Sequence, residues 1–209
     1  KELEQKLSEA NANCKEVAGR LTATRRKAAT TVERGMKDRL VPLGIPKVRF
    51  SISIEPREFQ RDGCDAVAFL FSANSSSDMM PISQVASGGE IARVMLSLKA
   101  MISNAVKLPT IIFDEIDTGV SGKIAEKMAL IMQEMAQSER QVISITHLPQ
   151  IAARGTTHYK VYKEETENGT ESTMTRLNDE QRVNEIAQML SGSDITDAAK
   201  HNAKDLLGA

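Results

Sequence analysis

The sequence lacks several features that define common functional classes. It has no tryptophan and only 3% aromatic residues, so the aromatic platforms that stack on single-stranded nucleic acid are not expected. Its two cysteines, Cys14 and Cys64, are too few for a disulfide framework or a structural zinc site. No apolar run approaches the roughly 20 residues of a membrane-spanning helix, and no secretory signal opens the chain. These absences favour a soluble, intracellular protein of a reducing compartment.

An excess of charge of one sign is also absent. The 27 basic and 28 acidic side chains give a net charge of −1, which excludes a polycation that holds nucleic acid by bulk charge. Residues 1–40 carry ten basic and six acidic side chains, a net +4, and the remaining residues carry −5. The 209 residues suffice for one large domain or two small ones. Because the first residue is Lys1 rather than methionine, we expect a piece of a longer protein.

Residues 1–40 have the pattern of one long helix. Apolar or small side chains recur at alternating steps of four and three residues, as in a coiled-coil seam: Leu3, Leu7, Ala10, Cys14, Val17 and Leu21. The register then weakens, and Val32, Met36 and Leu40 continue one position later. An amphipathic helix on a globular body remains open, but the strict early alternation favours the end of a coiled coil.

Beyond Pro42, strand and helix patterns alternate along the chain. Two strand patterns at 48–54 and 65–71 flank a turn and predict a hairpin, and a helical pattern follows at 88–106. Two apolar runs separated by a helix, at 110–113 and 141–146, predict a parallel βαβ unit with a strand covered on both faces. Patterns further along predict a second hairpin around Asn168-Gly169, from 158–163 and 172–177, and helices at 180–190 and 195–207.

The first motif that suggests chemistry is Ser87-Gly88-Gly89-Glu90, at the start of the predicted helix 88–106. A capping box explains the serine and the glutamate. It does not explain two glycines in the first turn, each costing about 1 kcal/mol relative to alanine in a helix interior. Glycine lets a ligand approach the backbone, and a helix N-terminus offers free N–H groups to an anion. Phosphate binding is the functional alternative.

The second motif is Asp114-Glu115, which ends an apolar strand. Ligands of parallel sheets gather at the carboxyl ends of the strands. Asp114 suits Mg²⁺, and Glu115 suits a general base that activates water. A solvated acidic strand end is the alternative.

A third candidate, His147, follows the neighbouring apolar strand and so is expected at the same edge of the sheet. A structural histidine is the alternative. A Ser-His-Asp hydrolase is poorly supported, because the segment around Ser121 is not a nucleophile elbow. A His/Cys metal site has too few ligands in the sequence.

In this order, the motifs resemble the ABC-type ATPase heads of the structural-maintenance-of-chromosomes (SMC) superfamily. They correspond there to the signature motif, the Walker B strand, the D-loop at 117–122 and the switch histidine. More narrowly, residues 85–93, 113–122, 145–153 and 182–192 are similar to the RecN family of bacterial DNA-repair proteins.

The resemblance implies an α/β fold, the C-terminal lobe of an ABC/SMC-type ATPase head. Such a lobe has a P-loop NTPase-like parallel sheet with flanking helices and antiparallel strands. We expect it at residues 41–209, with a coiled-coil stub at 1–40. The implied ligands are ATP and Mg²⁺, and the implied partner is a second head in a homodimer.

The resemblance also implies a role for each motif residue. Ser87, Gly88 and Gly89, with Glu90 beside them, would close over the γ-phosphate held by the partner head. Asp114 would complete the Mg²⁺ shell, and Glu115 would act as the general base. His147 would contact the γ-phosphate, and Asp117 would bridge the two heads.

One motif of such heads is missing from the sequence. No G-x-x-x-x-G-K-[ST] is present, because Gly122-Lys123 precedes Ile124 and lacks the upstream glycine. In these families the P-loop belongs to an N-terminal lobe, which is therefore an expected partner. Alone, the chain is expected to bind ATP weakly and to hydrolyse little.

The sequence therefore predicts the C-terminal head portion of a RecN-like ATPase in DNA double-strand-break repair and recombination. We expect it in the bacterial cytoplasm, associated with the nucleoid and with DNA rather than with a membrane. A cluster of Arg20, Arg25, Arg26 and Lys27 is a candidate for phosphate contact, with a solvated helix face as the alternative. Alternative functions are a non-enzymatic coiled-coil scaffold or adaptor and another SMC-family chromosome ATPase.

Overall fold

The structure is a computed structural model that describes residues 1–85, 87–106, 108–120, 122–137, 140–166, 169–192 and 194–208, without the side chains of residues 104, 105 and 166. The chain forms two compact units, unit 1 at Lys1–Met101 and unit 2 at Ile102–Ala209. The predicted boundary after residue 40 coincides with the end of the first helix and, as a domain boundary, stays a prediction.

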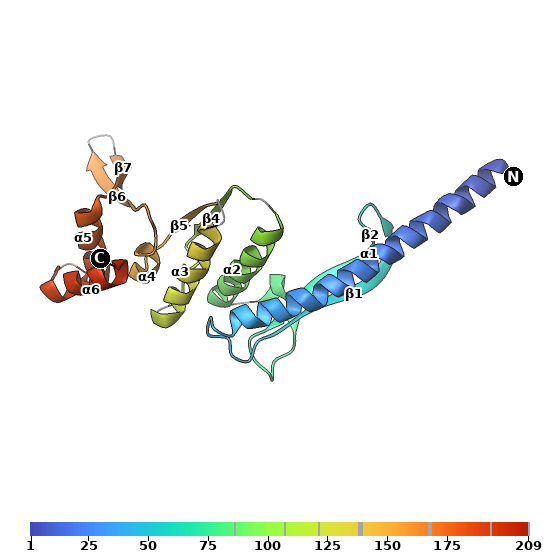
Figure 1. The fold of residues 1–209 in the computed structure, drawn as a ribbon, viewed down its shortest axis with the longest axis horizontal. Helices are drawn as coiled ribbons and strands as arrows, with labels where there is room; N and C mark the ends of the chain where they lie inside the picture. Colours follow the sequence, from blue (N-terminus) through green and yellow to red (C-terminus); the bar gives the residue numbers. More distant parts are fainter. Residues whose placement is uncertain are drawn as a thin grey trace. The chain divides into compact units, whose positions relative to one another are not determined.

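Unit 1 consists of a long helix beside an antiparallel sheet (Figure 1). Helix α1 (Glu2–Leu40) precedes strands β1 (Arg49–Gln60), β2 (Gly63–Ser72) and β3 (Met80–Pro81), which form a sheet in the order β1-β2-β3. A short 3₁₀ helix, η1 (Ile82–Gln84), leads to helix α2 (Gly88–Ala105), whose last residues belong to unit 2. The predicted first hairpin and the helix after it are confirmed.

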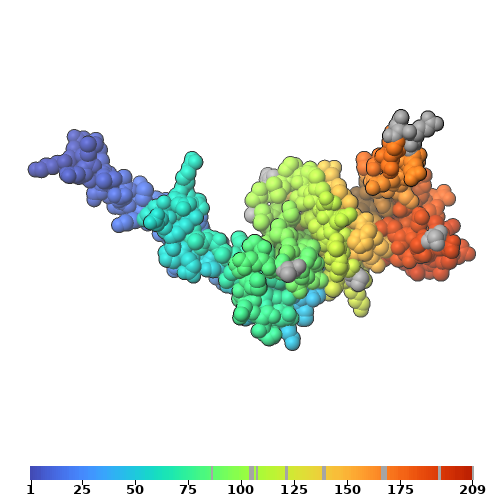
Figure 2. All heavy atoms as spheres, turned by 180° about the vertical axis from the view of Figure 1, so that it is seen from behind, coloured from blue at the N-terminus to red at the C-terminus, as the bar shows by residue number. Residues whose placement is uncertain are grey.

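Helix α1 changes its environment halfway along its length. The coiled-coil seam that the sequence predicts is exposed at Leu3, Leu7 and Val17. Figure 2 shows the start of α1 extending beyond the other elements of unit 1. In the second half, Met36 and Leu40 are fully buried in a core with Phe71 of β2. The weakened register therefore falls where α1 begins to pack on the hairpin, because a different stripe of the helix faces the sheet there.

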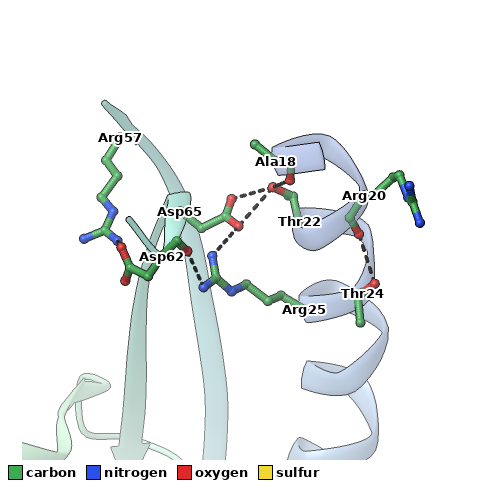
Figure 3. A network of polar contacts seen from close by, with 8 residues as sticks. All are labelled: Ala18, Arg20, Thr22, Thr24, Arg25, Arg57, Asp62 and Asp65. Atoms are coloured by element: carbon green, nitrogen blue, oxygen red, sulfur yellow. Dashed lines mark hydrogen bonds and ion pairs between the residues drawn. The ribbon is translucent and has the colours of Figure 1, made fainter. Parts of the chain in front are cut away.

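A polar network joins α1 to the far end of the hairpin (Figure 3). The carboxylate of Asp65, which is 5% exposed, accepts hydrogen bonds from the hydroxyl of Thr22 at 2.8 and 2.9 Å and from the guanidinium of Arg25 at 2.9 Å. Arg25 also donates to the backbone carbonyl of Asp62 at 2.7 Å. The hydrogen bond from Arg25 holds the pKa of Asp65 below its ordinary value. A buried carboxylate is tolerated because its oxygens are paired in this way.

Unit 2 contains the predicted βαβ unit, a second hairpin and further helices. Strand β4 (Thr110–Asp114), helix α3 (Gly122–Ala136) and strand β5 (Gln141–Ile145) give a parallel pair in which Ile112 lies opposite Ile143. The rest of unit 2 comprises α4 (Pro149–Ala152), the antiparallel strands β6 (Tyr159–Thr166) and β7 (Gly169–Arg176), α5 (Asp179–Ser191) and α6 (Asp197–Leu207). The βαβ unit, the hairpin, α5 and α6 confirm the predictions, whereas α4 was not predicted. Asn168 of the predicted turn lies outside the described residues. None of the helices, as far as they are described, has the length and apolar character needed to cross a membrane.

The β4–β5 pair differs from the prediction on one of its faces. Ile111 and Phe113 are buried, as expected beneath a covering helix. Ile112, Ile143 and Ile145 point to the opposite face and are 59%, 40% and 51% exposed. The prediction of a strand covered on both faces is therefore wrong for the described chain. The unalternated apolar sequence specifies two apolar faces, but the described residues cover only one of them.

Candidate nucleotide-binding residues

The segment Ser87–Glu90 lies at the start of α2 in unit 1. The Glu90 N–H donates to the Ser87 hydroxyl oxygen at 3.4 Å, which is one half of the predicted capping box. Ser87 and Gly88 are exposed, and Gly89 and Glu90 are half-buried. A Cβ added to Gly88 would have no heavy atom of the described chain within 4 Å. Packing within the described chain therefore gives no reason for glycine at this position, whereas close approach of a ligand would.

Asp114 and Glu115 lie at the carboxyl end of β4 in unit 2, and both are exposed. Asp114 is opposite Ile145 across the parallel pair. Glu115 has φ +46° and is the sole non-glycine residue of the described chain in the left-handed region, which costs an L-residue about 1–2 kcal/mol. Its N–H donates to the carbonyl of Ile145 at 3.1 Å, and its own carbonyl accepts from the Thr118 hydroxyl at 3.0 Å. These bonds hold the strained turn in place.

Asp117 is 1% exposed, and its carboxylate faces the residues that follow β5. Oδ2 accepts hydrogen bonds from the hydroxyl of Thr146 and, at 3.3 Å, from the backbone N–H of His147. Oδ1 lies 3.4 Å from Nδ1 of His147. The imidazole itself is 62% exposed. The predicted contact of Asp117 with a second head stays a prediction.

The structure therefore brings four of the predicted residues to one end of the β4–β5 pair: Asp114, Glu115, Asp117 and His147. Ser87 to Glu90 belong to unit 1, so the two halves of the predicted site are in different units. Among the described residues, no group of three or more His, Cys, Asp or Glu side chains forms a metal site. The candidate Mg²⁺ ligand is thus Asp114 on its own, which fits an ion that takes one or two carboxylates and otherwise phosphate and water.

Sequence reasoning missed the part played by Thr146. Its hydroxyl donates to the buried Asp117 carboxylate and accepts from the N–H of Leu148 at 3.0 Å. Thr146 thereby fixes the backbone on both sides of His147. The only signal in the sequence was a hydroxyl residue directly before the histidine at a strand end, a common local hydrogen-bonding arrangement.

Sequence comparison finds RecN proteins of several bacteria. The chain is 35% identical to the DNA repair protein RecN of Halalkalibacterium halodurans over 212 aligned residues, covering 99% of this chain and 37% of that protein. It is 39% identical to RecN of Rickettsia conorii, covering 92% of this chain and 35% of that protein. With RecN of Bacillus subtilis the identity is 40% over 73% of this chain and 26% of that protein. No family model matches the chain.

Structure comparison finds SMC head domains. The Smc head of Pyrococcus yayanosii, solved with a coiled coil and joint, has a TM-score of 0.61 at 19% identity, covering 80% of this chain and 30% of that chain. The Smc head of Pyrococcus furiosus, solved with an extended coiled coil and the C-terminal domain of ScpA, has a TM-score of 0.59 at 17% identity, covering 88% and 44%. An SMC ATPase studied for ATP-driven dimerisation and DNA-stimulated activation has a TM-score of 0.56 at 18% identity, covering 83% and 99%.

At these identities the structural likeness shows the fold alone, and the fold is that of an SMC ATPase head. The sequence likeness is stronger, because it extends over most of this chain at 35–40% identity. The chain spans about a third of the length of the curated relatives that it matches. By this likeness, the chain belongs to the RecN family of bacterial DNA-repair proteins.

Proposed function

We propose that this chain is the C-terminal head portion of a DNA-repair ATPase that acts on double-strand breaks through ATP-driven engagement of two heads. The observation that carries the proposal is the backbone of Glu115, which is held in the left-handed region at the carboxyl end of β4. Strain of this kind persists where the surrounding structure imposes it, and it clusters at functional sites. The matched relatives are DNA-repair proteins, and a similar SMC ATPase dimerises with ATP.

The residues at the β4–β5 end suit Mg²⁺-dependent hydrolysis of ATP. Asp114 would hold Mg²⁺, which, when bound, neutralises charge on the phosphates. Glu115, exposed beside it, would accept a proton from the attacking water. His147 would contact the γ-phosphate, because its ring is exposed while its backbone is anchored.

The segment Ser87–Glu90 would act on nucleotide bound to the second head. Ser87 and Gly88 are exposed at the start of α2, where N–H groups and the helix dipole favour a phosphate. Gly89 adds to the open backbone, and Glu90 holds Ser87 through its N–H. Engagement of two copies would then complete each nucleotide site.

The exposed face of the β4–β5 pair supports a partner lobe. Parallel strands are normally buried on both faces, and here Ile112, Ile143 and Ile145 are open on one of them. We assign this face to the N-terminal lobe of the same protein, which would also supply the missing P-loop. On this proposal residues 41–209 form the head portion, residues 1–40 the coiled-coil arm, and the chain alone turns over little ATP.

DNA would be the substrate of the assembled protein at the bacterial nucleoid. Fewer side chains of the basic cluster on α1 can contact DNA than the sequence predicts, because Arg25 donates to Asp65. Arg20, in contrast, points away from the hairpin (Figure 3). Arg20, Arg26 and Lys27 remain exposed and available to backbone phosphates.

The test uses the full-length protein with Glu115→Gln, which keeps the size of the side chain and removes the base. We expect hydrolysis of ATP to fall by about 10²–10⁴-fold, while ATP still drives formation of a stable engaged dimer in size-exclusion chromatography with light scattering. Glu134→Gln, the same change at an exposed position of α3, is the matched control and should hydrolyse ATP normally.

Two results would contradict the proposal. Normal hydrolysis by the Glu115→Gln protein would remove the role of Glu115 as the base. Absence of ATP hydrolysis in the unmodified full-length protein, with and without DNA, would instead favour a non-enzymatic scaffold or adaptor with an ATPase-like fold.

A further inference from the structure

The buried carboxylate of Asp117 contacts the segment that follows β5. These contacts are not needed to close the turn in which Asp117 itself lies. Asp117 closes its turn through the backbone, where its carbonyl accepts from the N–H of Val120 at 3.1 Å. Its side chain accepts hydrogen bonds from the Thr146 hydroxyl and the His147 N–H, which lie 29 and 30 residues away in the sequence. The aspartate side chain is therefore needed to hold Thr146 and His147 after β5 rather than to form the turn.

One oxygen of this carboxylate is left without a hydrogen bond. Oδ1 is buried, and among the described residues it has no hydrogen-bond partner. Nδ1 of His147 lies 3.4 Å away, at the edge of hydrogen-bond distance. Burying a carboxylate oxygen without a partner is costly, so a proton on Nδ1 that points at Oδ1 would be favoured. Hydrogen bonds at such sites often tighten when ligand binds.

We propose that Asp117 is a positioning residue for His147, which it holds with Nδ1–H towards the buried carboxylate and Nε2 free for a ligand. A neutral imidazole carries one proton, and the group that faces one nitrogen decides which nitrogen holds it. With the proton on Nδ1, Nε2 is a hydrogen-bond acceptor when the ring is neutral and a donor when it is protonated.

This inference deepens the proposed function and rests on it only for the identity of the ligand. The contacts of Asp117 lie within one chain, so the orientation of His147 is expected before nucleotide or a second head arrives. An exposed histidine without such an anchor would keep rotating in the bound state and lose this orientational freedom only on reaching the transition state. The benefit of Asp117 is therefore expected in the rate of the reaction rather than in the affinity for nucleotide.

The direct test is the tautomer of His147, measured by ¹⁵N NMR of the histidine-labelled chain at a pH where the ring is neutral. Comparison with His147→Ala assigns the signal. We expect Nδ1–H to predominate in the unmodified chain. Predominance of Nε2–H would overturn the inference, and this measurement needs neither ATP nor a variant of Asp117.

Asp117→Asn supplies the sharper comparison. An asparagine keeps one oxygen for the Thr146 and His147 donors but places an amide N–H₂ beside Nδ1, so the tautomer should shift to Nε2–H. Thr146→Val is the matched control, because it removes a hydrogen bond from the same carboxylate and leaves the imidazole contact. It should lower stability and leave the tautomer unchanged. An equal shift in both variants would mean that general loosening, not the carboxylate, sets the tautomer.

The final test is a double-mutant cycle for ATP hydrolysis in the full-length protein. We expect Asp117→Asn to lower kcat by about 10- to 100-fold with little change in KM, and to cause no further loss in a His147→Ala background. Full additivity would contradict action through His147. If His147→Ala alone leaves hydrolysis unchanged, the proposed role of His147 fails, whereas the tautomer result on the isolated chain still decides the inference about Asp117.

Discussion

Replacing Glu115 by glycine and by alanine separates the strain of its backbone from the loss of its carboxylate. Both variants remove the same side-chain atoms beyond Cβ, and they differ in the cost of φ +46°. The left-handed conformation costs an L-residue about 1–2 kcal/mol, and glycine avoids this cost. Glycine also gains about 0.4–1 kcal/mol of freedom in the unfolded chain. The Glu115→Gly chain should therefore be more stable than Glu115→Ala by about 0.5–1 kcal/mol.

The assay is urea unfolding of the 209-residue chain, with the slope of the transition checked for constancy among the variants. Lys127, exposed within α3, provides the control position. Glycine there should be less stable than alanine by about 1 kcal/mol, because the residue has helical backbone. The sign of the difference between glycine and alanine should thus reverse between the two positions. If the Glu115→Ala chain is as stable as the Glu115→Gly chain, the backbone at position 115 is not strained. The observation that supports Glu115 as the base then fails.

Three further predictions concern stability. The pKa of Asp65 is lowered, chiefly by the hydrogen bond from Arg25, so its contribution is present above the unfolded-state value and is lost as pH falls through the lowered one. Asp65→Asn should flatten this acid dependence in urea titrations, and an unchanged slope would contradict it. Burial, with the charge of Arg182, lowers the pKa of His158, so the unfolded chain binds the proton more readily and unit 2 should lose stability as pH falls through about 6.5. His158→Gln should lose less over that range, as followed by circular dichroism. Arg140 donates to three backbone carbonyls of unit 2, so Arg140→Ala should cost about 2 kcal/mol in urea unfolding, and a loss below about 0.5 kcal/mol would show that water replaces these bonds.

Much of the fold follows from local patterns in the sequence. The period of α1, the alternation of β1, the strand-helix-strand order of the βαβ unit and the second hairpin were all predictable, because each depends on neighbours within a few residues. The candidate site was predictable as a list, from the order of its motifs. Its arrangement was not, because the turn at Glu115 and the direction of the Asp117 carboxylate depend on residues about 30 positions away.

By itself, the sequence determined the elements, the motif order and the family. Tertiary structure alone decided which stripe of α1 is buried, since Met36 and Leu40 pack in one core with Phe71 of β2. It decided that no segment of the described chain covers Ile112 and Ile143, since an apolar run specifies that a strand needs cover but not which segment supplies it. It also decided that Asp117 contacts His147 within the chain. Local patterns encode the conformation of a segment, whereas the pairing of distant polar groups depends on which of them are buried together.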